Sequence, residues 1–309
     1  MCRHVAYTGP ALPLGRLLVE PPHALYRQSW APRRQRYGTV NADGFGVGWY
    51  ADGDPVPARY RRAGPVWADR SFADLARVVS SGALLAAVRD ATLSGADAEA
   101  AAAPFADGPW LFSHNGAVPG WPDSLAPLVA TLPPADVLSL EARNDAAFVW
   151  ALALARLRRG DDPGRALAGT VGEVAAVSPA SRLNLLLTDG ATIAATAWGD
   201  TLWYRSAAGP ATVVASEPHD DDPRWVEVPD RTLLLASRGH VRLAPLGRRS
   251  DAAAHRPSPA SARSAASAPD SGSGSESDPD PDPGSGSDPG SGSGSGRPGG
   301  LPSAKEPCT

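Results

Sequence analysis

The stretch Leu183–Trp198, which reads LNLLLTDGATIAATAW, indicates how this chain folds. Two apolar runs, Leu183–Thr188 and Thr192–Trp198, flank the turn residues Asp189-Gly190, and this pattern predicts an antiparallel hairpin. Further short runs follow at Leu202–Arg205, Thr212–Ser216, Arg231–Ala236 and His240–Leu243, separated by Gly, Asp and Pro. The region therefore predicts an antiparallel meander.

Short strands and two clear helices precede this meander. Strands are expected at Cys2–Thr8, Phe45–Ala51, Ala58–Ala63, Leu84–Ala91 and Trp110–Ser113. Helices are expected at Asn144–Arg159, which ends in a basic turn before Gly160, and at about Gly164–Val177. Strands, two helices and then more strands do not follow the βαβ rhythm of a doubly wound or barrel fold. The order predicts an α+β fold of layered antiparallel sheets with helices outside them.

Composition divides the chain at residue 250. The last 59 residues, 251–309, hold 34 Gly, Ser or Pro and one large aliphatic residue, Leu301. Such a segment cannot bury a core, so we predict one folded domain over residues 2–250 and a disordered Gly/Ser/Pro/Asp-rich tail over residues 251–309. The tail carries 8 acidic and 4 basic residues, which leaves 25 of each sign before it. A neutral domain has no broad positive field, so nucleic-acid binding is not expected.

The positions of the cysteines and the lengths of the apolar runs indicate the cellular compartment of the protein. Cys2 and Cys308 stand at opposite ends of the chain, which gives neither a disulfide framework nor a zinc cluster and favours a reducing compartment. No apolar run has the length of a signal peptide core or the ~18 residues of a membrane span. We therefore expect a cytoplasmic, soluble protein with no membrane partner, no metal and no other cofactor. The oligomeric state stays open.

Cys2 is the first candidate for chemistry. A cysteine behind Met1 becomes the N-terminal residue if Met1 is removed, and its side chain is small enough for removal. The α-amino group, with a pKa of roughly 7.7 to 8, can then accept the thiol proton directly or through water. One residue would supply both nucleophile and base. The alternative is that position 2 holds a cysteine by chance.

Asn115-Gly116 is the second candidate, directly after the apolar residues Trp110–Ser113 and His114. The amide of Asn115 and the backbone N–H of Gly116 could point at one spot, and two such donors form an oxyanion hole. The alternative is a type I′ hairpin turn, for which Asn-Gly is the commonest dipeptide. His114 is expected to make a structural hydrogen bond rather than to act in catalysis.

Two single charges could bind a ligand. Arg89 lies in the apolar run Leu84–Ala91, and a guanidinium in a buried strand needs a carboxylate partner, which a ligand could supply through a bidentate contact. Asp145 opens a helix, where an acidic residue is most often an N-terminal cap. The segment Asn41–Trp49 has three alternating glycines without G-x-G-x-x-G spacing. It indicates a strand that another backbone or a ligand approaches closely.

Together these residues resemble the class II glutamine amidotransferases, a family of N-terminal nucleophile hydrolases. The shared series, in order, is Cys-Arg-His at 2–4, N-x-D-G-x-G-x-G-W at 41–49, Arg-x-Ala-Thr at 89–92, Ala-Pro-Phe at 103–105, His-Asn-Gly at 114–116 and Asp145. The resemblance covers residues 2 to about 245 and implies a four-layer αββα sandwich. It also implies that Cys2 is the nucleophile and that Asn115 and Gly116 form the oxyanion hole. Arg89 would bind the α-carboxylate of a glutamyl group and Asp145 its α-ammonium.

Three segments narrow the resemblance within the family. Arg27–Pro32 (RQSWAP), the run that ends at Tyr50 (NADGFGVGWY) and Ser216–Trp225 (SEPHDDDPRW) resemble the branch that acts in ergothioneine biosynthesis. That branch removes the γ-glutamyl group from γ-glutamyl-hercynylcysteine sulfoxide, which implies a γ-glutamyl amidohydrolase with a small-molecule substrate. The residues by themselves lead only to a γ-glutamyl amidase. Asp90, where an aromatic is common, and Ala146, where a hydroxyl residue is common, depart from the family pattern.

The acceptor of the glutamyl group is expected to be water, because only the tail follows the predicted domain. One alternative is a glutaminase subunit that passes ammonia to a separate synthase. Another is a binding module that retains the fold without catalysis. Trp30, Trp49 and Trp225 are candidates for holding a trimethylammonium group by cation–π contact, although each could simply be packed.

Overall fold

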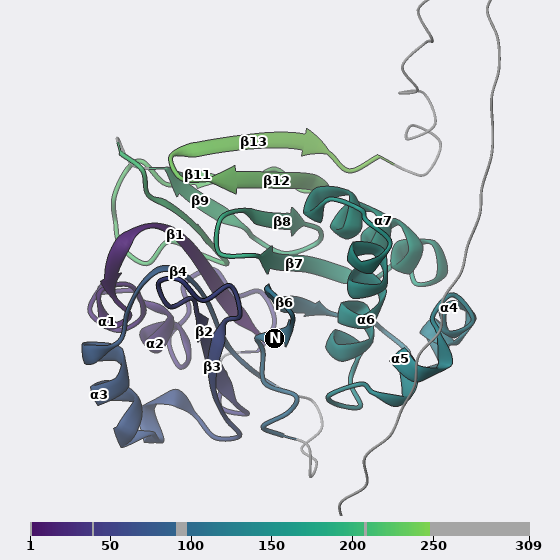
Figure 1. Ribbon diagram of the computed structural model, residues 1–309, viewed down its shortest axis with the longest axis horizontal. Coiled ribbons are helices and arrows are strands. Elements are labelled where there is room, and N and C mark those ends of the chain that lie inside the picture. The colour runs from purple at the N-terminus through teal and green to yellow at the C-terminus, as the bar shows by residue number, and fades with distance from the viewer. Residues whose placement is uncertain (1, 39, 91–97, 207–208, 248–309) are drawn as a thin grey trace, which may run out of the picture. The chain divides into compact units, whose positions relative to one another are not determined.

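The computed structural model of the chain describes residues 2–38, 40–90, 98–206 and 209–247. The predicted tail at 251–309 lies outside these ranges. Within these ranges the strands form two antiparallel sheets, one of seven strands in the order β11-β9-β10-β1-β4-β2-β3 and one of six in the order β13-β12-β8-β7-β6-β5 (Figure 1).

The first sheet comprises β1 (Arg3–Pro13), β2 (Phe45–Trp49), β3 (Ala58–Arg62), β4 (Ser80–Val88), β9 (Trp203–Ser206), β10 (Thr212–Ala215) and β11 (Val226–Glu227). The second comprises β5 (Phe105–Asp107), β6 (Trp110–Ala117), β7 (Arg182–Thr188), β8 (Ile193–Ala197), β12 (Thr232–Ser237) and β13 (His240–Pro245). The helices are α1 (Gly15–Leu18), α2 (Leu25–Gln28), α3 (Arg70–Val78), α4 (Ala126–Val129), α5 (Pro134–Leu138), α6 (Asp145–Arg158) and α7 (Pro163–Val177), with 3-10 turns at Val66–Ala68 and Asp123–Leu125.

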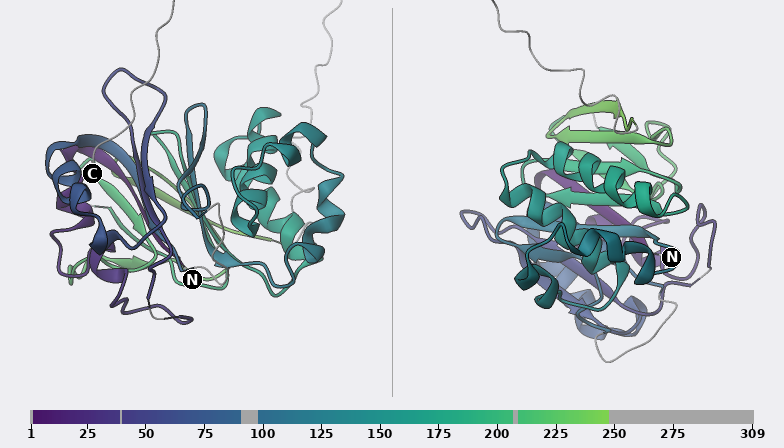
Figure 2. Two further views of the ribbon diagram at one scale, coloured as in Figure 1. Left: turned by 90° about the horizontal axis from the view of Figure 1, so that it is seen from below. Right: turned by 90° about the vertical axis from the view of Figure 1, so that its right-hand side faces the viewer.

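The two sheets pack face to face with helices on both outer sides (Figure 2). Side chains of β1 show the layering, because successive residues of a strand point to opposite faces. Val5 and Tyr7 pack with the residues of α1 and α3 outside the first sheet, whereas Ala6 packs against the second sheet. On the other outer side, Phe112 of β6 stacks on Trp150 of α6 with ring centroids 5.1 Å apart. The predicted α+β class and αββα sandwich are confirmed.

The predicted single meander is wrong at its middle. After β8 the chain crosses to the first sheet, where β9 pairs with β10 and β10 pairs with β1, Val5 opposite Ala215. β12 then returns to the second sheet and pairs with β8, Leu234 opposite Ala195. Alternation along a segment identifies a strand but does not encode its neighbour, so the sequence could not reveal this crossing. Its consequence is that Ser216, directly after β10, lies beside the beginning of β1.

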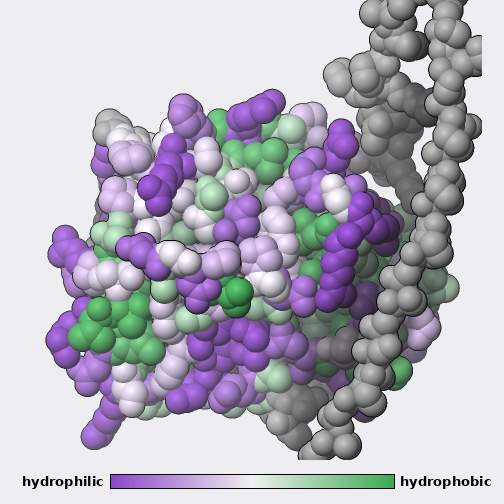
Figure 3. Space-filling model, viewed as in Figure 1, coloured by the Kyte–Doolittle hydropathy of each residue, from purple (hydrophilic) through white to green (hydrophobic). Residues whose placement is uncertain are grey.

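The face of the molecule drawn in Figure 1 has mixed polarity. Polar side chains cover most of it, and apolar ones gather in separate patches (Figure 3). Three buried apolar clusters instead fill the spaces between the four layers. Burial between layers therefore accounts for most of the hydrophobic stabilisation of the fold.

Candidate active site

A pocket of about 610 Å³ opens at the end of the sandwich where β1 begins. Its walls come from Cys2 just before β1, the end of β4 with the two residues after it, the segment 101–105, the end of β6 with the loop behind it, and the start of α6. Cys2, Arg89, Gly116 and Asp145 all line it. The pocket thus joins four of the five residues that the sequence singles out, and Asn115 directly precedes Gly116.

Cys2 is half-buried and lies one residue before β1. The β1–β4 pairing sets Arg3 opposite Val88, so the next residues outward, Cys2 and Arg89, meet at the pocket. Burial raises the pKa of the Cys2 thiol, whereas a hydrogen bond from the Asp90 backbone and the charge of Arg89 act in the opposite direction. The surroundings thus keep the thiol protonated until a base removes its proton.

Asn115 and Gly116 lie inside β6 and not at a turn. They pair with Asn184 and Leu183 of β7, so the hairpin-turn alternative is wrong. Asn115 is fully buried, and its Nδ2 donates to Ser216 Oγ at 3.2 Å. The strand continues past the Asn-Gly pair because β7 supplies a partner for every residue up to Ala117.

Gly116 is required by close packing. A Cβ at this position would overlap the carbonyl oxygen of Arg182 on the neighbouring strand. The same carbonyl accepts a hydrogen bond from His114 Nε2 at 2.9 Å, in line with the structural role expected for that histidine. Gly116 itself lines the pocket.

Arg89 follows the end of β4 and is half-buried. Its backbone N–H donates to the carbonyl of Gly44 at 2.7 Å, and its Nη1 donates to the carbonyl of Asp43 at 3.2 Å. One side of the guanidinium is therefore fixed by the glycine-rich segment before β2. A planar group fixed in this way can offer its other N–H donors to a carboxylate in the pocket.

Asp145 is the first residue of α6 but not its cap. Asn144 caps the helix by accepting from Ala147 N at 2.8 Å, so the capping alternative for Asp145 is wrong. Asp145 Oδ2 accepts from Val118 N at 2.9 Å, and its Oδ1 from Ala146 N at 2.8 Å. Asp145 therefore lines the pocket and anchors the loop after β6.

A buried polar cluster lies between the sheets beside the pocket, and sequence reasoning missed it. His4 Nδ1 pairs with Ser113 Oγ at 3.2 Å, and the backbone N–H of His4 donates to Ser216 Oγ at 3.0 Å. Burial lowers the pKa of His4 to about 3, so its ring is neutral. The alternation of side chains along a strand could have indicated this cluster. Cys2, just before β1, and His4 are two positions apart and point to the same side, and Ser113 and Asn115 share one face of β6.

The segment Ser216–Trp225 holds the loop at 31–38 next to the pocket. Buried Glu217 accepts from Arg33 N at 3.0 Å and from Arg34 N at 2.7 Å. Gly38, at a φ of 71°, lies so close to the carboxylate of Asp90, a pocket residue, that a Cβ there would overlap it. The segment at 216–225, although far from Cys2 in sequence, thus contacts a loop that lies beside the pocket.

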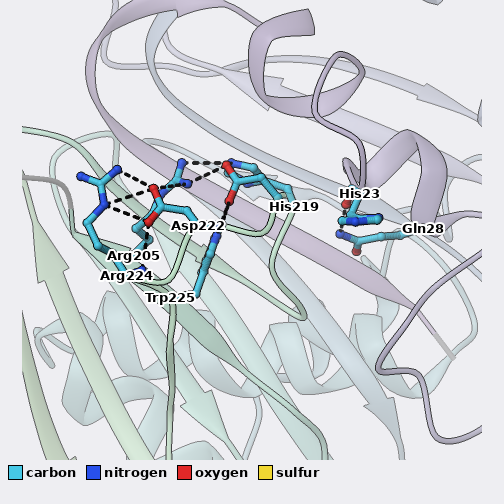
Figure 4. Close-up of polar contacts among 8 residues, drawn as sticks. His23, Gln28, Arg205, His219, Asp222, Arg224 and Trp225 are labelled. Carbon is cyan, nitrogen blue, oxygen red and sulfur yellow. Dashed lines mark hydrogen bonds and ion pairs between the residues drawn. The ribbon is translucent and has the colours of Figure 1, made fainter.

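Ion pairs and hydrogen bonds hold the rest of that segment, one of them to Arg205 of β9 (Figure 4). Arg205 donates to Asp220 at 2.6 Å, and Trp225 Nε1 donates to the same carboxylate at 2.7 Å. Asp222 pairs with Arg224. Burial lowers the pKa of His219 to about 4, and its ring meets that of Trp225 edge-on. These contacts fix the segment without reaching the pocket.

The three tryptophans considered as partners of a trimethylammonium group do not line the pocket. Trp225 lies under the guanidinium of Arg205, and Trp30 packs edge-on against Tyr26 and Trp67. Neither they nor Trp49 line the pocket, whose aromatic residues are Phe105 and Trp121. Trp121 stands on the loop that Asp145 anchors and packs against Phe148 at 5.5 Å between ring centroids.

Among the described residues, no group of three or more His, Cys, Asp or Glu side chains is arranged to hold a metal ion. None of the described helices has both the length and the apolarity needed to cross a membrane.

The sequence matches one class of proteins. The sequence model of the class II glutamine amidotransferases matches residues 23–210, and this chain belongs to that family. It is 43% identical over 246 residues to the γ-glutamyl-hercynylcysteine sulfoxide hydrolase of Mycolicibacterium smegmatis, which covers 80% of this chain and all of that protein. It is 41% identical over 249 residues to the protein of the same name from Mycobacterium tuberculosis H37Rv, covering 80% of this chain and 98% of that one.

Solved structures share the fold. A glutamine aminotransferase class-II domain protein from Silicibacter pomeroyi superposes with a TM-score of 0.58 at 23% identity, covering 80% of this chain and all of that one. The allosteric regulatory enzyme of purine biosynthesis gives a TM-score of 0.54 at 15% identity, covering 80% of this chain and 49% of that one. These similarities establish the arrangement of sheets and helices.

Proposed function

We propose that this chain is a hydrolase that cleaves γ-glutamyl-hercynylcysteine sulfoxide to glutamate and hercynylcysteine sulfoxide in ergothioneine biosynthesis. The observation that carries the proposal is the pocket in which Cys2, Arg89, Gly116 and Asp145 meet. The high identity to two hydrolases of that name, over nearly their whole length, supports the choice of substrate. A volume of about 610 Å³ also leaves room for a leaving amine larger than ammonia.

Cys2 is proposed as the nucleophile after removal of Met1. Its α-amine takes the thiol proton, the sulfur attacks the γ-carbonyl carbon, and the carbonyl oxygen becomes an oxyanion. The C–N bond then breaks, and the leaving amine takes the proton from the ammonium. Water adds to the resulting thioester, the C–S bond breaks, and glutamate and the free thiol are released. No external oxidant, reductant or cofactor is needed in this sequence.

The remaining residues are proposed to bind the glutamyl group and the developing charge. Gly116 N–H and the Asn115 amide would donate to the oxyanion. Arg89 would bind the α-carboxylate through the donors that Asp43 leaves available, and Asp145 would pair with the α-ammonium. These assignments use opposite charges on two walls of one pocket, so only a substrate with both groups of the glutamyl head satisfies both residues.

The proposal is tested by product analysis on the full chain. Incubation with γ-glutamyl-hercynylcysteine sulfoxide and, separately, with glutamine should release glutamate from both, with a much higher kcat/KM for the first. Mass detection should find hercynylcysteine sulfoxide in the first reaction. Turnover of glutamine alone would instead indicate a glutaminase subunit that delivers ammonia to a synthase. No turnover of either compound by a chain whose intact mass shows Cys2 at its N-terminus would indicate a binding module.

The domain boundary is also a proposal. We infer that residues 2–250 form the whole catalytic unit and that the tail at 251–309 contributes nothing to it, because the tail has almost no apolar surface to bury. Removal of residues 251–309 should then leave kcat and Tm nearly unchanged. A large fall in Tm would place the boundary further along the chain.

A further inference from the structure

Ser216 contacts both strands of the site. Its backbone N–H donates to the carbonyl of His4 at 2.9 Å. Its Oγ accepts from the backbone N–H of His4 at 3.0 Å and from Asn115 Nδ2 at 3.2 Å. His4 is two residues after Cys2 on β1, whereas Asn115 is on β6. One buried hydroxyl therefore bonds the nucleophile strand of the first sheet and the oxyanion strand of the second.

This contact constrains the amide of Asn115. An Asn side chain has two N–H donors on Nδ2 and one acceptor, Oδ1. Ser216 takes one donor, which leaves the second for another acceptor. Asn115 Oδ1 is buried without a hydrogen-bond partner among the described residues. Its amide orientation therefore depends on the bond to Ser216.

We propose that Ser216 is a positioning residue that orients Asn115, so that the second N–H of its amide meets the oxyanion of the tetrahedral intermediate. The inference rests on the proposed function, because it requires Asn115 to act on that oxyanion. A donor held in place before the reaction stabilises the transition state more than one that must first reorient. Loss of the Ser216 hydroxyl should therefore lower kcat and leave substrate binding unchanged.

Ser113 provides a matched control. It is buried, lies two residues before Asn115 on the same face of β6, and also links β6 to β1 through its bond to His4 Nδ1. That bond does not involve Asn115. Ser113→Ala thus removes a buried hydroxyl and an inter-sheet contact of the same kind without freeing the amide.

The experiment measures kcat, KM and Tm with γ-glutamyl-hercynylcysteine sulfoxide for Ser216→Ala, Ser113→Ala, Asn115→Ala and the double variant Asn115→Ala/Ser216→Ala. We expect Ser216→Ala to lower kcat about tenfold with KM within about twofold, and Ser113→Ala to change kcat less than about twofold. The double variant should be no slower than Asn115→Ala, because Ser216 acts through Asn115.

Each other outcome has a defined meaning. If Asn115→Ala is slow and Ser216→Ala adds its full effect to it, the positioning inference is overturned while the proposed function stands. Equal losses of kcat in Ser113→Ala and Ser216→Ala would also overturn it. If Asn115→Ala keeps full kcat, the role of Asn115 fails and the inference fails with it. Total inactivity of the unmodified chain towards the substrate would instead overturn the proposed function.

Two further variants cover the case in which Ser216→Ala does not fold. Ser216→Thr keeps the hydroxyl, and Ser216→Cys keeps the size but offers only a weak acceptor. The inference requires a higher kcat for Ser216→Thr than for Ser216→Cys. An equal or reversed order would overturn it.

Discussion

Two ends of β6 differ sharply in the side chains that they turn towards the other sheet. Leu111, near the start of the strand, is fully buried in the apolar cluster with Ala6 and Leu85. Asn115, four residues later on the same face, is equally buried but contacts the hydroxyl of Ser216. One strand therefore contributes to the core at one end and to the candidate site at the other.

The end of β6 that carries Asn115 buries polar atoms and therefore contributes less hydrophobic stabilisation than the end that carries Leu111. Leu111 can bury its whole side chain at no polar cost, whereas every buried polar atom loses its contacts with water. Five buried side-chain atoms of three residues near the site have no hydrogen-bond partner among the described residues: His4 Nε2, Asn115 Oδ1 and the three guanidinium nitrogens of Arg3. Their desolvation is offset by the apolar layers around them. Changes at the apolar end should therefore affect stability, and changes at the polar end should affect the rate.

The largest effect is expected from Cys2→Ala. Removal of the thiol takes away the proposed nucleophile, so kcat should fall at least about a thousandfold, with Tm nearly unchanged. Cys308→Ala, at the other cysteine, is the matched control and should keep full activity. Steady-state kinetics and thermal melts of both variants check this. Substantial turnover by Cys2→Ala would end the proposed mechanism.

Leu111→Ala should do the reverse at the apolar end of β6. Truncation of this fully buried leucine leaves a cavity, which lowers the free energy of unfolding by about 2–5 kcal/mol. We expect kcat at a temperature where the variant is folded to stay within a few-fold of the parent. Urea unfolding together with kinetics measures both effects. A large loss of kcat with unchanged stability would show that the two ends of β6 are not separable.

Asn115→Asp should lower kcat by about 100-fold or more, because it replaces a donor by a negative charge where negative charge develops. The fold should persist, since the hydroxyl of Ser216 can turn and donate to the new carboxylate. Kinetics of this variant beside its melting curve provide the measurement. A rate within a few-fold of the parent would remove Asn115 from the mechanism.

Arg89→Lys should mainly raise KM. Lysine keeps the charge but loses the planar arrangement of donors, and the loss of one hydrogen bond to a charged group costs about 1.5–3 kcal/mol, or roughly ten- to a hundredfold in binding. We expect kcat to change much less than KM. Substrate titrations with the two proteins distinguish these parameters, and an unchanged KM would exclude Arg89 from binding the glutamyl group.

Acid should destabilise the polar end gradually. The folded state holds the pKa of His4 near 3 by burial, whereas an unfolded histidine has a pKa of about 6.5. Between these values the unfolded state binds more protons, so this contribution to stability is present above pH 6.5 and is lost as pH falls. The slope from one histidine is at most about 1.4 kcal/mol per pH unit. His4→Gln should flatten the urea-unfolding profile between pH 6.5 and 4.5, and an unaltered slope would contradict this origin.

Local pattern predicted much of the site and less of its surroundings. The residues Cys2, Arg89, Gly116 and Asp145 were assigned from short motifs, and the pocket contains all four. The motif around Asn115 leaves an oxyanion hole and a hairpin turn open, because the conformation of Asn-Gly depends on whether β7 supplies a partner. Ser216 opens the segment Ser216–Trp225, but that motif does not indicate the contact with Asn115, since the two residues lie 101 positions apart.

The sequence by itself determined the longer strands and helices and the α+β class, and it singled out the side chains for which a chemical role is proposed. Those properties follow from alternation, capping and residue type, all of which act over a few residues. Only the tertiary structure decided that β10 joins β1, that Asn144 rather than Asp145 caps α6, and that Ser216 reaches Asn115. The reason is physical: strand partners are selected by the burial of whole faces against each other, and a local pattern specifies a face without specifying what covers it.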